Sequence, residues 1–263
     1  VSVELGDTPF EIFYINMSPA ARSPRWLVYK HEPVAHEARY TCTEDIEKYL
    51  GISFDDNEFD PEELITAIEI VMPKLEKLYN SKVRHYVVKQ HTLLVCRQFE
   101  KYAFELNTKV MNIDLMRLVL AMHDIGKAID RATQHIYTQS LIREFWSESP
   151  FTDYELKLVE ALLKDDHLGK FFQGKYDCNM LQEEIKKDAE ELQIDASCLL
   201  QLKMVLYQCD IASYTKDAGG LRYLEHMFVY ENNKKTFNEE NGLLAMSADY
   251  WSRYKQLKSL IYE

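Results

Sequence analysis

Apolar residues recur every three or four positions along most of the chain after residue 60, as they do in helices that pack one face against a core. In one segment, for example, Val88, Leu94 and Val95 mark such a stripe. The pattern predicts helices at residues 61–80, 84–107, 112–125, 133–146, 152–167, 179–193, 196–217, 219–231 and 247–262. We therefore expect an all-α protein built as a helical bundle.

The first 60 residues follow a different pattern. Two short runs, PFEIFYINM and RWLVYKHE, are rich in aromatic and β-branched residues and predict two short strands or extended segments. A short helix is expected in TEDIEKYLG, with Thr43 as its N-cap and Gly51 at its end. We assign residues 1–60 to an N-terminal extension with an acidic connector, and residues 61–263 to a helical domain whose core spans 80–220.

The acidic stretch DDNEFDPEE, residues 55–63, marks where the first helix of that domain should begin. Asp60 can cap the helix N-terminus, and Pro61 suits the first helical position because the N–H that proline lacks would be unpaired there. Glu62 and Glu63 then interact favourably with the positive end of the helix dipole.

The composition fits a folded, mainly helical protein. Of the 263 residues, 46% are hydrophobic and 12% aromatic, enough to bury a sizeable core, while eight Gly and seven Pro are few for an all-β array. The net charge of −12 disfavours non-specific binding to a nucleic-acid backbone or an anionic membrane, since both require a basic surface. A small phosphorylated ligand held in a local pocket is compatible with that charge.

The five cysteines are odd in number and form no Cys-x-x-Cys pair: Cys42, Cys96, Cys178, Cys198 and Cys209. This pattern argues against a disulfide framework or a thiolate zinc site and favours a reducing compartment. No apolar run is long enough to span a membrane and no signal peptide is visible, so we expect a cytoplasmic protein. Because the chain begins with Val rather than Met, we expect it to be a trimmed piece of a longer protein.

Five polar side chains interrupt the apolar faces of five predicted helices: His91, His123, His135, His167 and Asp210. A buried imidazole or carboxylate is costly unless it is paired, hydrogen-bonded or bound to a metal. Any one of them is most simply a core residue with a hydrogen-bond partner. Independent core histidines, however, have no reason to recur on the inward faces of consecutive helices. We infer a polar centre that the helices share, with Asp124 beside His123.

The residue types in this centre point to a metal. Imidazole nitrogens and carboxylate oxygens together suit divalent Mn, Fe, Co, Ni or Zn, with Mg less favoured. Helical bundles commonly build such sites from side chains on facing helices.

The same residues resemble the signature of the HD-domain superfamily of metal-dependent phosphohydrolases, which is a His, then an adjacent His–Asp pair, then a distant Asp. Here these are His91 in KQHTLLV, His123 and Asp124 in AMHDIGKAID, and Asp210 in QCDIASY. Locally, HDIGKAID is similar to the segment found in ribonuclease Y-type and HD-GYP domains. The resemblance covers roughly residues 80–220 and implies that these four side chains bind one metal ion.

Family members with a second metal add two histidines between the His–Asp pair and the last Asp. His135 and His167 occupy that interval in the right order. However, the chain has DDHLGK where HD-GYP proteins usually have a His–His pair in a glycine-rich context, and it lacks the GYP tripeptide. These departures disfavour cyclic di-GMP as the substrate and leave one ion and two ions both open.

For the reaction, the resemblance implies a metal-activated water that attacks phosphorus, with Asp124 among the catalytic residues. Lys127, one turn after His123, is expected to bind phosphate or to stabilise the transition state. The alternative is that Lys127 is a solvated lysine near a helix end, where its charge interacts favourably with the helix dipole. Arg131 and Arg84 are weaker candidates for substrate binding, because basic residues at such positions more often form surface ion pairs.

Other residues near the motif are less informative. Tyr214, after Asp210, could line the mouth of the cavity, and Asp165 and Asp166 could orient the imidazole of His167. The remaining histidines match no motif position and are interpreted as structural: His31, His36, His85 and His226.

The predicted function is hydrolysis of a nucleotide or another small phosphoester, as a phosphodiesterase or a phosphomonoesterase; long nucleic acids and membranes are disfavoured as partners. Two alternatives remain open. Some HD-domain oxygenases, such as those similar to myo-inositol oxygenase, bind two irons and share an HD-x-GK motif. The module could also be a non-catalytic sensor or interaction domain. The sequence does not address the oligomeric state.

Overall fold

The computed structural model describes residues 40–55, 59–103, 111–238 and 242–262, together with the backbone of three short strands near the N-terminus. The chain divides into two compact units, residues 1–38 and residues 39–263.

The N-terminal unit contains a small antiparallel sheet in the order β1-β2-β3. Its strands are β1 (Ser2–Glu4), β2 (Pro9–Glu11) and β3 (Tyr29–Lys30). Phe10 pairs with Val3 on one side and with Lys30 on the other. The two strands predicted from the aromatic runs are confirmed as β2 and β3, and β1 adds a third.

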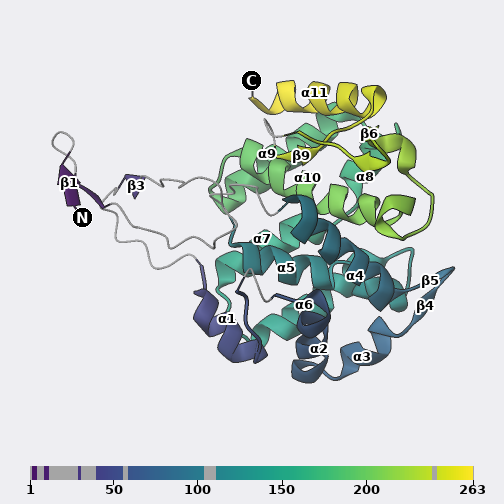
Figure 1. Cartoon of the computed structure of the whole chain (residues 1–263). Coiled ribbons are helices and arrows are strands. Elements are labelled where there is room, and N and C mark those ends of the chain that lie inside the picture. Colours follow the sequence, from purple (N-terminus) through teal and green to yellow (C-terminus); the bar gives the residue numbers. More distant parts are fainter. Residues whose placement is uncertain are drawn as a thin grey trace. The chain divides into compact units, whose positions relative to one another are not determined.

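The larger unit is helical, which confirms the all-α prediction (Figure 1). Its α-helices are α1 (Thr43–Leu50), α2 (Pro61–Val71), α3 (Lys74–Tyr79), α4 (Val88–Gln98), α5 (Ile113–Met122), α6 (Gln134–Ser147), α7 (Asp153–Leu163), α8 (His167–Phe172), α9 (Cys178–Leu192), α10 (Ala196–Ser213) and α11 (Ala248–Tyr262). A π-helical turn, η1 (Phe99–Ala103), continues α4, and a 3₁₀ turn, η2 (Ile125–Ala128), follows α5.

Helix α5 is the central helix of the core. Every residue from Asp114 to Met122 is buried, so the helix is covered on all sides. It packs against α4, and α4 packs in turn against α10 (Figure 1). These three helices provide the backbone from which the polar centre predicted above is built.

Helix ends follow the predicted capping chemistry, with one exception. Asp60 caps α2 by accepting a hydrogen bond from the backbone N–H of Glu62, and Gly51 ends α1 in the left-handed region at φ 71°. The prediction that Thr43 is an N-cap is wrong, because Cys42 holds that position. The Thr43 hydroxyl instead donates to the carboxylate of Asp114, at 2.6 Å.

The helical unit begins earlier than predicted. The predicted boundary lies at residue 61, whereas the compact unit starts at Arg39. Helix α1 packs against α2, and Thr41 donates from its backbone N–H to the buried carboxylate of Glu155, at 3.0 Å. These contacts tie residues 40–50 to the helices.

Two parts of the predicted helical pattern are not helical. The helix predicted at 84–107 starts only at Val88, because residues 84–87 belong to a hairpin of β4 (Lys82–Val83) and β5 (Tyr86–Val87), with Arg84 at φ 54° in the turn. The prediction of a helix at residues 219–231 is also wrong. A 3₁₀ turn, η3 (Lys216–Ala218), ends at Gly219, whose φ of 81° no right-handed helix allows, and a second 3₁₀ turn, η4 (Glu225–Met227), follows.

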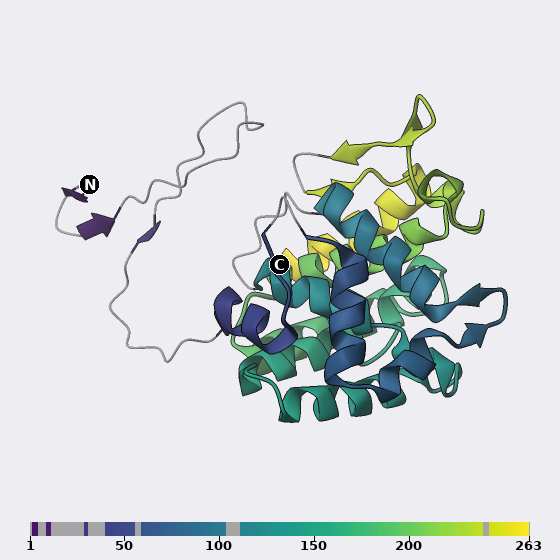
Figure 2. The same ribbon diagram turned by 60° about the horizontal axis from the view of Figure 1, so that its bottom comes forward.

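Beyond η4 the chain forms two more hairpins. β6 (Tyr230–Glu231) pairs with β7 (Lys234–Lys235) through Asn232 and Asn233, both with positive φ, as asparagine tolerates in tight turns. β8 (Phe237–Asn238) then pairs with β9 (Leu243–Leu244). Figure 2 shows the β4–β5 hairpin and these C-terminal hairpins projecting from the helical body.

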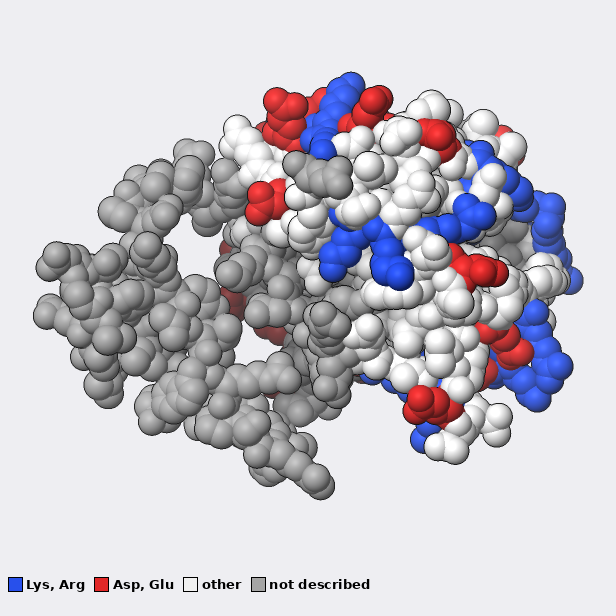
Figure 3. Space-filling view, turned by 90° about the horizontal axis from the view of Figure 1, so that it is seen from above, with Lys and Arg blue, Asp and Glu red and all other residues white. Residues whose placement is uncertain are grey.

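The surface chemistry is mixed rather than uniformly acidic. On the face shown in Figure 3, lysines and arginines gather along one edge, with acidic side chains interspersed. All five cysteines are free thiols in the structure. No helix in the described ranges has the length and apolar character needed to cross a membrane.

Candidate metal centre

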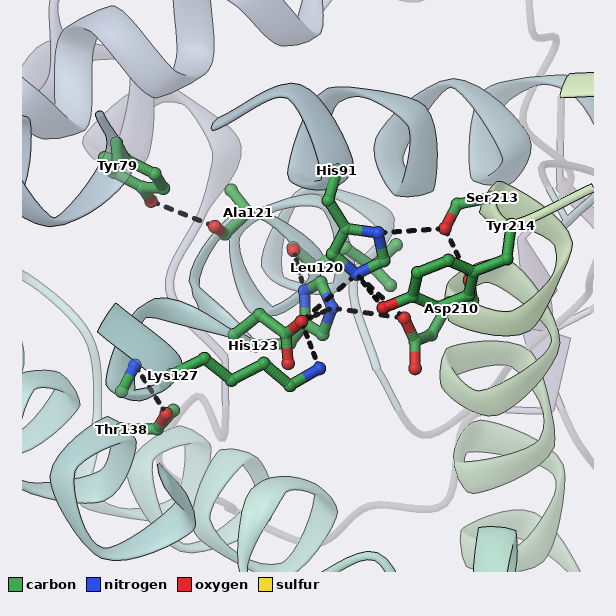
Figure 4. Close-up of polar contacts among 12 residues, drawn as sticks. Tyr79, His91, Leu120, Ala121, His123, Lys127, Thr138, Asp210, Ser213 and Tyr214 are labelled. Atoms are coloured by element: carbon green, nitrogen blue, oxygen red, sulfur yellow. Dashed lines mark hydrogen bonds and ion pairs between the residues drawn. The ribbon is translucent and has the colours of Figure 1, made fainter. Parts of the chain in front are cut away.

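Four predicted residues converge where α4, α5 and α10 meet (Figure 4). His91 comes from the first turn of α4, His123 and Asp124 follow the last residue of α5, and Asp210 lies near the end of α10. One potential ligand atom from each lies within 4.8 Å of the others. His91 and Asp124 are each only 3% exposed. The structure therefore brings together side chains from three sequence segments into one buried cluster.

Hydrogen bonds fix both histidines in the same tautomer. Nδ1 of His123 lies 2.6 Å from the carbonyl oxygen of Leu120, which can only accept, so Nδ1 carries the proton. Ser213 Oγ donates to the carbonyl of Asp210 at 2.6 Å and is left to accept from Nδ1 of His91, at 3.0 Å. In the neutral ring each Nε2 then carries a lone pair directed into the cluster, as in metal-binding histidines.

The carboxylates of Asp124 and Asp210 face these Nε2 atoms. Nε2 of His91 is 2.9 Å from Asp210 and 3.1 Å from Asp124, and Nε2 of His123 is 3.6 to 3.7 Å from the same two carboxylates. Among the described residues, Nε2 of His123 and Oδ1 of Asp210 are buried without a hydrogen-bond partner. A bound cation would pair with these two atoms and, once His91 has lost its Nε2 proton, with His91 and Asp124 as well.

The aromatic ring of Tyr214 covers one side of the cluster. It stacks on His91 with ring centroids 4.6 Å apart, and its hydroxyl lies 3.3 Å from Nε2 of His91. Tyr214 therefore lies directly beside the imidazole nitrogen that faces the two carboxylates. The sequence suggested only that it lines the mouth of the cavity, and its contact with His91 places it next to the centre.

Lys127 forms an ion pair with the carboxylate of Asp124. Burial disfavours its charged form, but Asp124 and Asp210 outweigh this effect and raise the pKa of the ammonium. Burial likewise opposes ionisation of Asp124, whereas Lys127 and His123 lower the pKa of that carboxyl. Burial also disfavours protonation of His91, yet the two carboxylates raise its pKa to about 9. The centre thus concentrates negative charge that a proton or a cation must balance.

The backbone after α5 explains how one short motif supplies so many of these groups. Helix α5 ends at Met122, and η2 turns back so that the N–H of Lys127 donates to the carbonyl of Asp124, at 2.9 Å. Gly126 lies against α6, where its N–H donates to Thr138 Oγ1 at 3.1 Å. A Cβ at Gly126 would lie 2.1 Å from the carbonyl oxygen of Gln134, so only glycine fits. This contact holds Asp124 and Lys127 at the centre.

A cavity of about 1260 Å³ opens beside the cluster. It exceeds the roughly 300–1,000 Å³ usual for small-molecule pockets, so it can hold more than a bare phosphate. Its lining includes the predicted site residues His123, Asp124, Lys127 and Asp210, the predicted second-metal residues His135 and His167, and the weaker substrate candidates Arg84 and Arg131. Both arginines are exposed, as surface residues would be.

The predicted second-metal histidines are not brought together as one ligand pair. His167 lies with Asp165 and Glu184 in a separate set of potential ligands. Its Nδ1 is 2.8 Å from Glu184 and 3.5 Å from Asp165, and its ring stacks on Tyr176. His135 lines the cavity but belongs to neither set within the described residues.

Some residues of the site could not be found from the sequence. Glu184 lies on α9, a helix with several other glutamates from which nothing distinguishes it, and Ser213 is one small polar residue among many. His85, interpreted from the sequence as structural, lines the cavity next to Tyr86. The one useful signal was position: Ser213 and Tyr214 follow Asp210 by about one helical turn.

No protein-family model matches the chain, and no curated protein matches it at a significant level of similarity. A functional conclusion must therefore come from the chemistry of the site.

Proposed function

We propose that this protein is a metal-dependent phosphohydrolase of the HD-domain type that acts on a nucleotide or another small phosphoester. The observation that carries the proposal is the arrangement of His91, His123, Asp124 and Asp210. Both imidazoles have Nδ1 occupied by an acceptor and direct Nε2 at two buried carboxylates. Two imidazole nitrogens and two carboxylates that converge in this way form a ligand set that suits a divalent transition metal.

The proposed ligands are these four side chains. A divalent ion held there lowers the pKa of a water molecule and offsets the negative charge of a phosphate oxygen. The protein's own contribution is to keep the carboxylates ionised and the imidazoles oriented. Leu120 and Ser213 do the latter by accepting the two Nδ1 protons.

Lys127 gives the site its affinity for an anion. Two carboxylates neutralise a divalent ion, so the ammonium of Lys127 leaves the combined centre with a net positive charge. Lys127 also lines the cavity, where it can donate to a phosphate oxygen and stabilise the charge that develops there. Arg84 and Arg131 on the same cavity provide further positive charge for an extended phosphorylated substrate.

The cavity and the net charge favour a small substrate. A cavity of about 1260 Å³ accommodates a nucleotide or a short oligonucleotide. The net charge of −12 opposes a long nucleic acid. The proposed enzyme is cytoplasmic. Its partner is the small phosphorylated substrate, and the proposed reaction requires neither a membrane nor a macromolecular partner.

The test combines metal analysis of protein purified without chelator with turnover assays on nucleoside monophosphates, cyclic and short linear phosphodiesters, and non-nucleotide phosphoesters. We expect about one equivalent of a transition metal, because the set of Asp165, His167 and Glu184 is already paired internally. Glu184→Gln should therefore keep that ion. Two equivalents, one of them lost in Glu184→Gln, would establish a two-metal site instead. Protein without metal and without metal-stimulated turnover would refute the proposal.

Lys127→Met should reduce kcat by about 100-fold while the metal content stays near that of the unchanged protein. Methionine fills a similar volume, and Lys127 contributes charge rather than a ligand atom. The measurement is steady-state kinetics beside metal analysis of the same preparation. Unchanged kcat would remove Lys127 from the catalytic residues, and loss of the ion would show that it acts by positioning Asp124.

A further inference from the structure

We propose that the rings of Tyr223 and His85 form a stacking platform for the base of a nucleotide substrate, at the mouth of the cavity. This inference rests on the proposed function and narrows its substrate class from phosphoesters in general to nucleotides. Both residues line the same cavity as the metal centre. Neither belongs to the motif, and each lies in a segment that was predicted to be helical but is not.

A continuous row of aromatic rings leads from the metal centre to Tyr223. Tyr214 stacks on His91 with centroids 4.6 Å apart, and Tyr223 meets Tyr214 edge to face at 6.4 Å. His85 lies 5.1 Å from Tyr223 and contacts Tyr86, which in turn contacts both His91 and Tyr214. Two ring-to-ring steps therefore separate the ligand cluster from Tyr223, which leaves space for a sugar between a phosphate and a base.

Two different elements deliver the outer rings. His85 lies in the turn of the β4–β5 hairpin, and Tyr223 lies in the segment between α10 and η4. Figures 1 and 2 both show that hairpin and that segment on the same side of the helical unit. Residues far apart in the sequence thus meet at one edge of the cavity.

The segment that carries Tyr223 is held firmly against the end of α10. The backbone N–H of Tyr223 donates to the carbonyl of Tyr214, at 3.2 Å, and the N–H of Gly220 donates to the carbonyl of Thr215, at 3.0 Å. A Cβ at Gly220 would lie 1.8 Å from the carbonyl oxygen of Ser213, so glycine is needed for this close approach. The fold therefore presents Tyr223 in a defined position.

The exposure of this ring is what points to a ligand. Tyr223 is 54% exposed, although it is a large aromatic residue in a tightly fixed segment. Its exposed surface adjoins a cavity that also contains Lys127 and Arg84. A ligand that fits both features has an anionic end and a flat aromatic end. Stacking on aromatic side chains tolerates every base, since each base has a π-face.

The experiment is calorimetric titration of the metal-loaded protein with two non-hydrolysable probes, the methylenephosphonate analogues of adenosine 5′-monophosphate and of ribose 5-phosphate. We expect the adenosine analogue to bind at least about 10-fold more tightly. Tyr223→Ala should remove most of this difference and His85→Ala part of it, while neither changes the affinity for the ribose analogue by more than about twofold. Tyr223→Phe should bind like the unchanged protein, because the ring is retained.

Tyr262→Ala is the matched control, because Tyr262 is 64% exposed and lies on α11, outside the cavity lining. Equal affinity for the two probes, or an equal loss for both in Tyr223→Ala, would overturn the platform while metal binding and phosphoester turnover still support the proposed function. Tighter binding of the ribose analogue would also overturn it and would indicate a sugar phosphate. Absence of metal and of turnover in the unchanged protein would instead overturn the proposed function itself.

Discussion

Asp124→Asn is expected to leave the protein folded but with less than about a tenth of its metal and at least about 1,000-fold less phosphohydrolase activity. Loss of a residue that hydrogen-bonds to a metal ligand already lowers metal affinity or activity by about 10–100-fold, so loss of a ligand itself should lower them further. Asparagine keeps the volume of Asp124 and removes its charge. One carboxylate then remains to balance a divalent ion in a buried centre, beside the positive charge of Lys127.

Three measurements check this expectation: metal content, turnover, and the shift of Tm on adding Mn²⁺. A metal that binds only the folded state stabilises it by about 2.7 kcal/mol at 100 times its Kd, so Tm should rise for the unchanged protein and not for Asp124→Asn. Asp153→Asn is the matched control, because Asp153 is an exposed aspartate in the first turn of α7. Full metal content in Asp124→Asn would show that Asp124 is not a ligand.

Gly126→Ala is expected to destabilise the fold by about 3 kcal/mol and to disrupt the metal centre at the same time, since overpacking costs about 1–3 kcal/mol or more. The added methyl group would lie 2.1 Å from the backbone oxygen of Gln134 and 2.6 Å from Thr138 Oγ1. A backbone atom cannot rotate away as a side chain can. The 3₁₀ turn η2 must therefore move away from α6, and it carries Asp124 and Lys127 with it.

The comparison for Gly126→Ala is Gly51→Ala. Gly51 has φ 71°, and no heavy atom lies within 4 Å of the position that an added methyl group would take. Alanine there meets only backbone strain of about 1 kcal/mol. Chemical denaturation measures both losses of unfolding free energy, and metal analysis reports the centre. Equal destabilisation by the two substitutions, with the metal retained in both, would contradict the role assigned to the Gly126 contact.

Local rules explain why the sequence predicted much of the helical frame. Asp60 and Pro61 specify the start of α2, and Gly51 specifies the end of α1, because capping depends on residues next to the helix end. The same locality explains the failures. The hairpin at Arg84 and the turns after Gly219 depend on backbone conformations that apolar spacing does not report.

Periodicity in the sequence is sufficient to predict most of the helices and the residue types of the candidate centre, because it places each side chain on the inward or outward face of its own helix. Periodicity singled out His91, His123 and Asp210, and Asp124 was added because it adjoins His123 in the sequence. Which inward faces meet is a property of the folded chain. Folding separates His167 and Glu184 from the first cluster and brings Tyr223 to His85. Distances between helices depend on the packing of the whole core, and no local pattern encodes them.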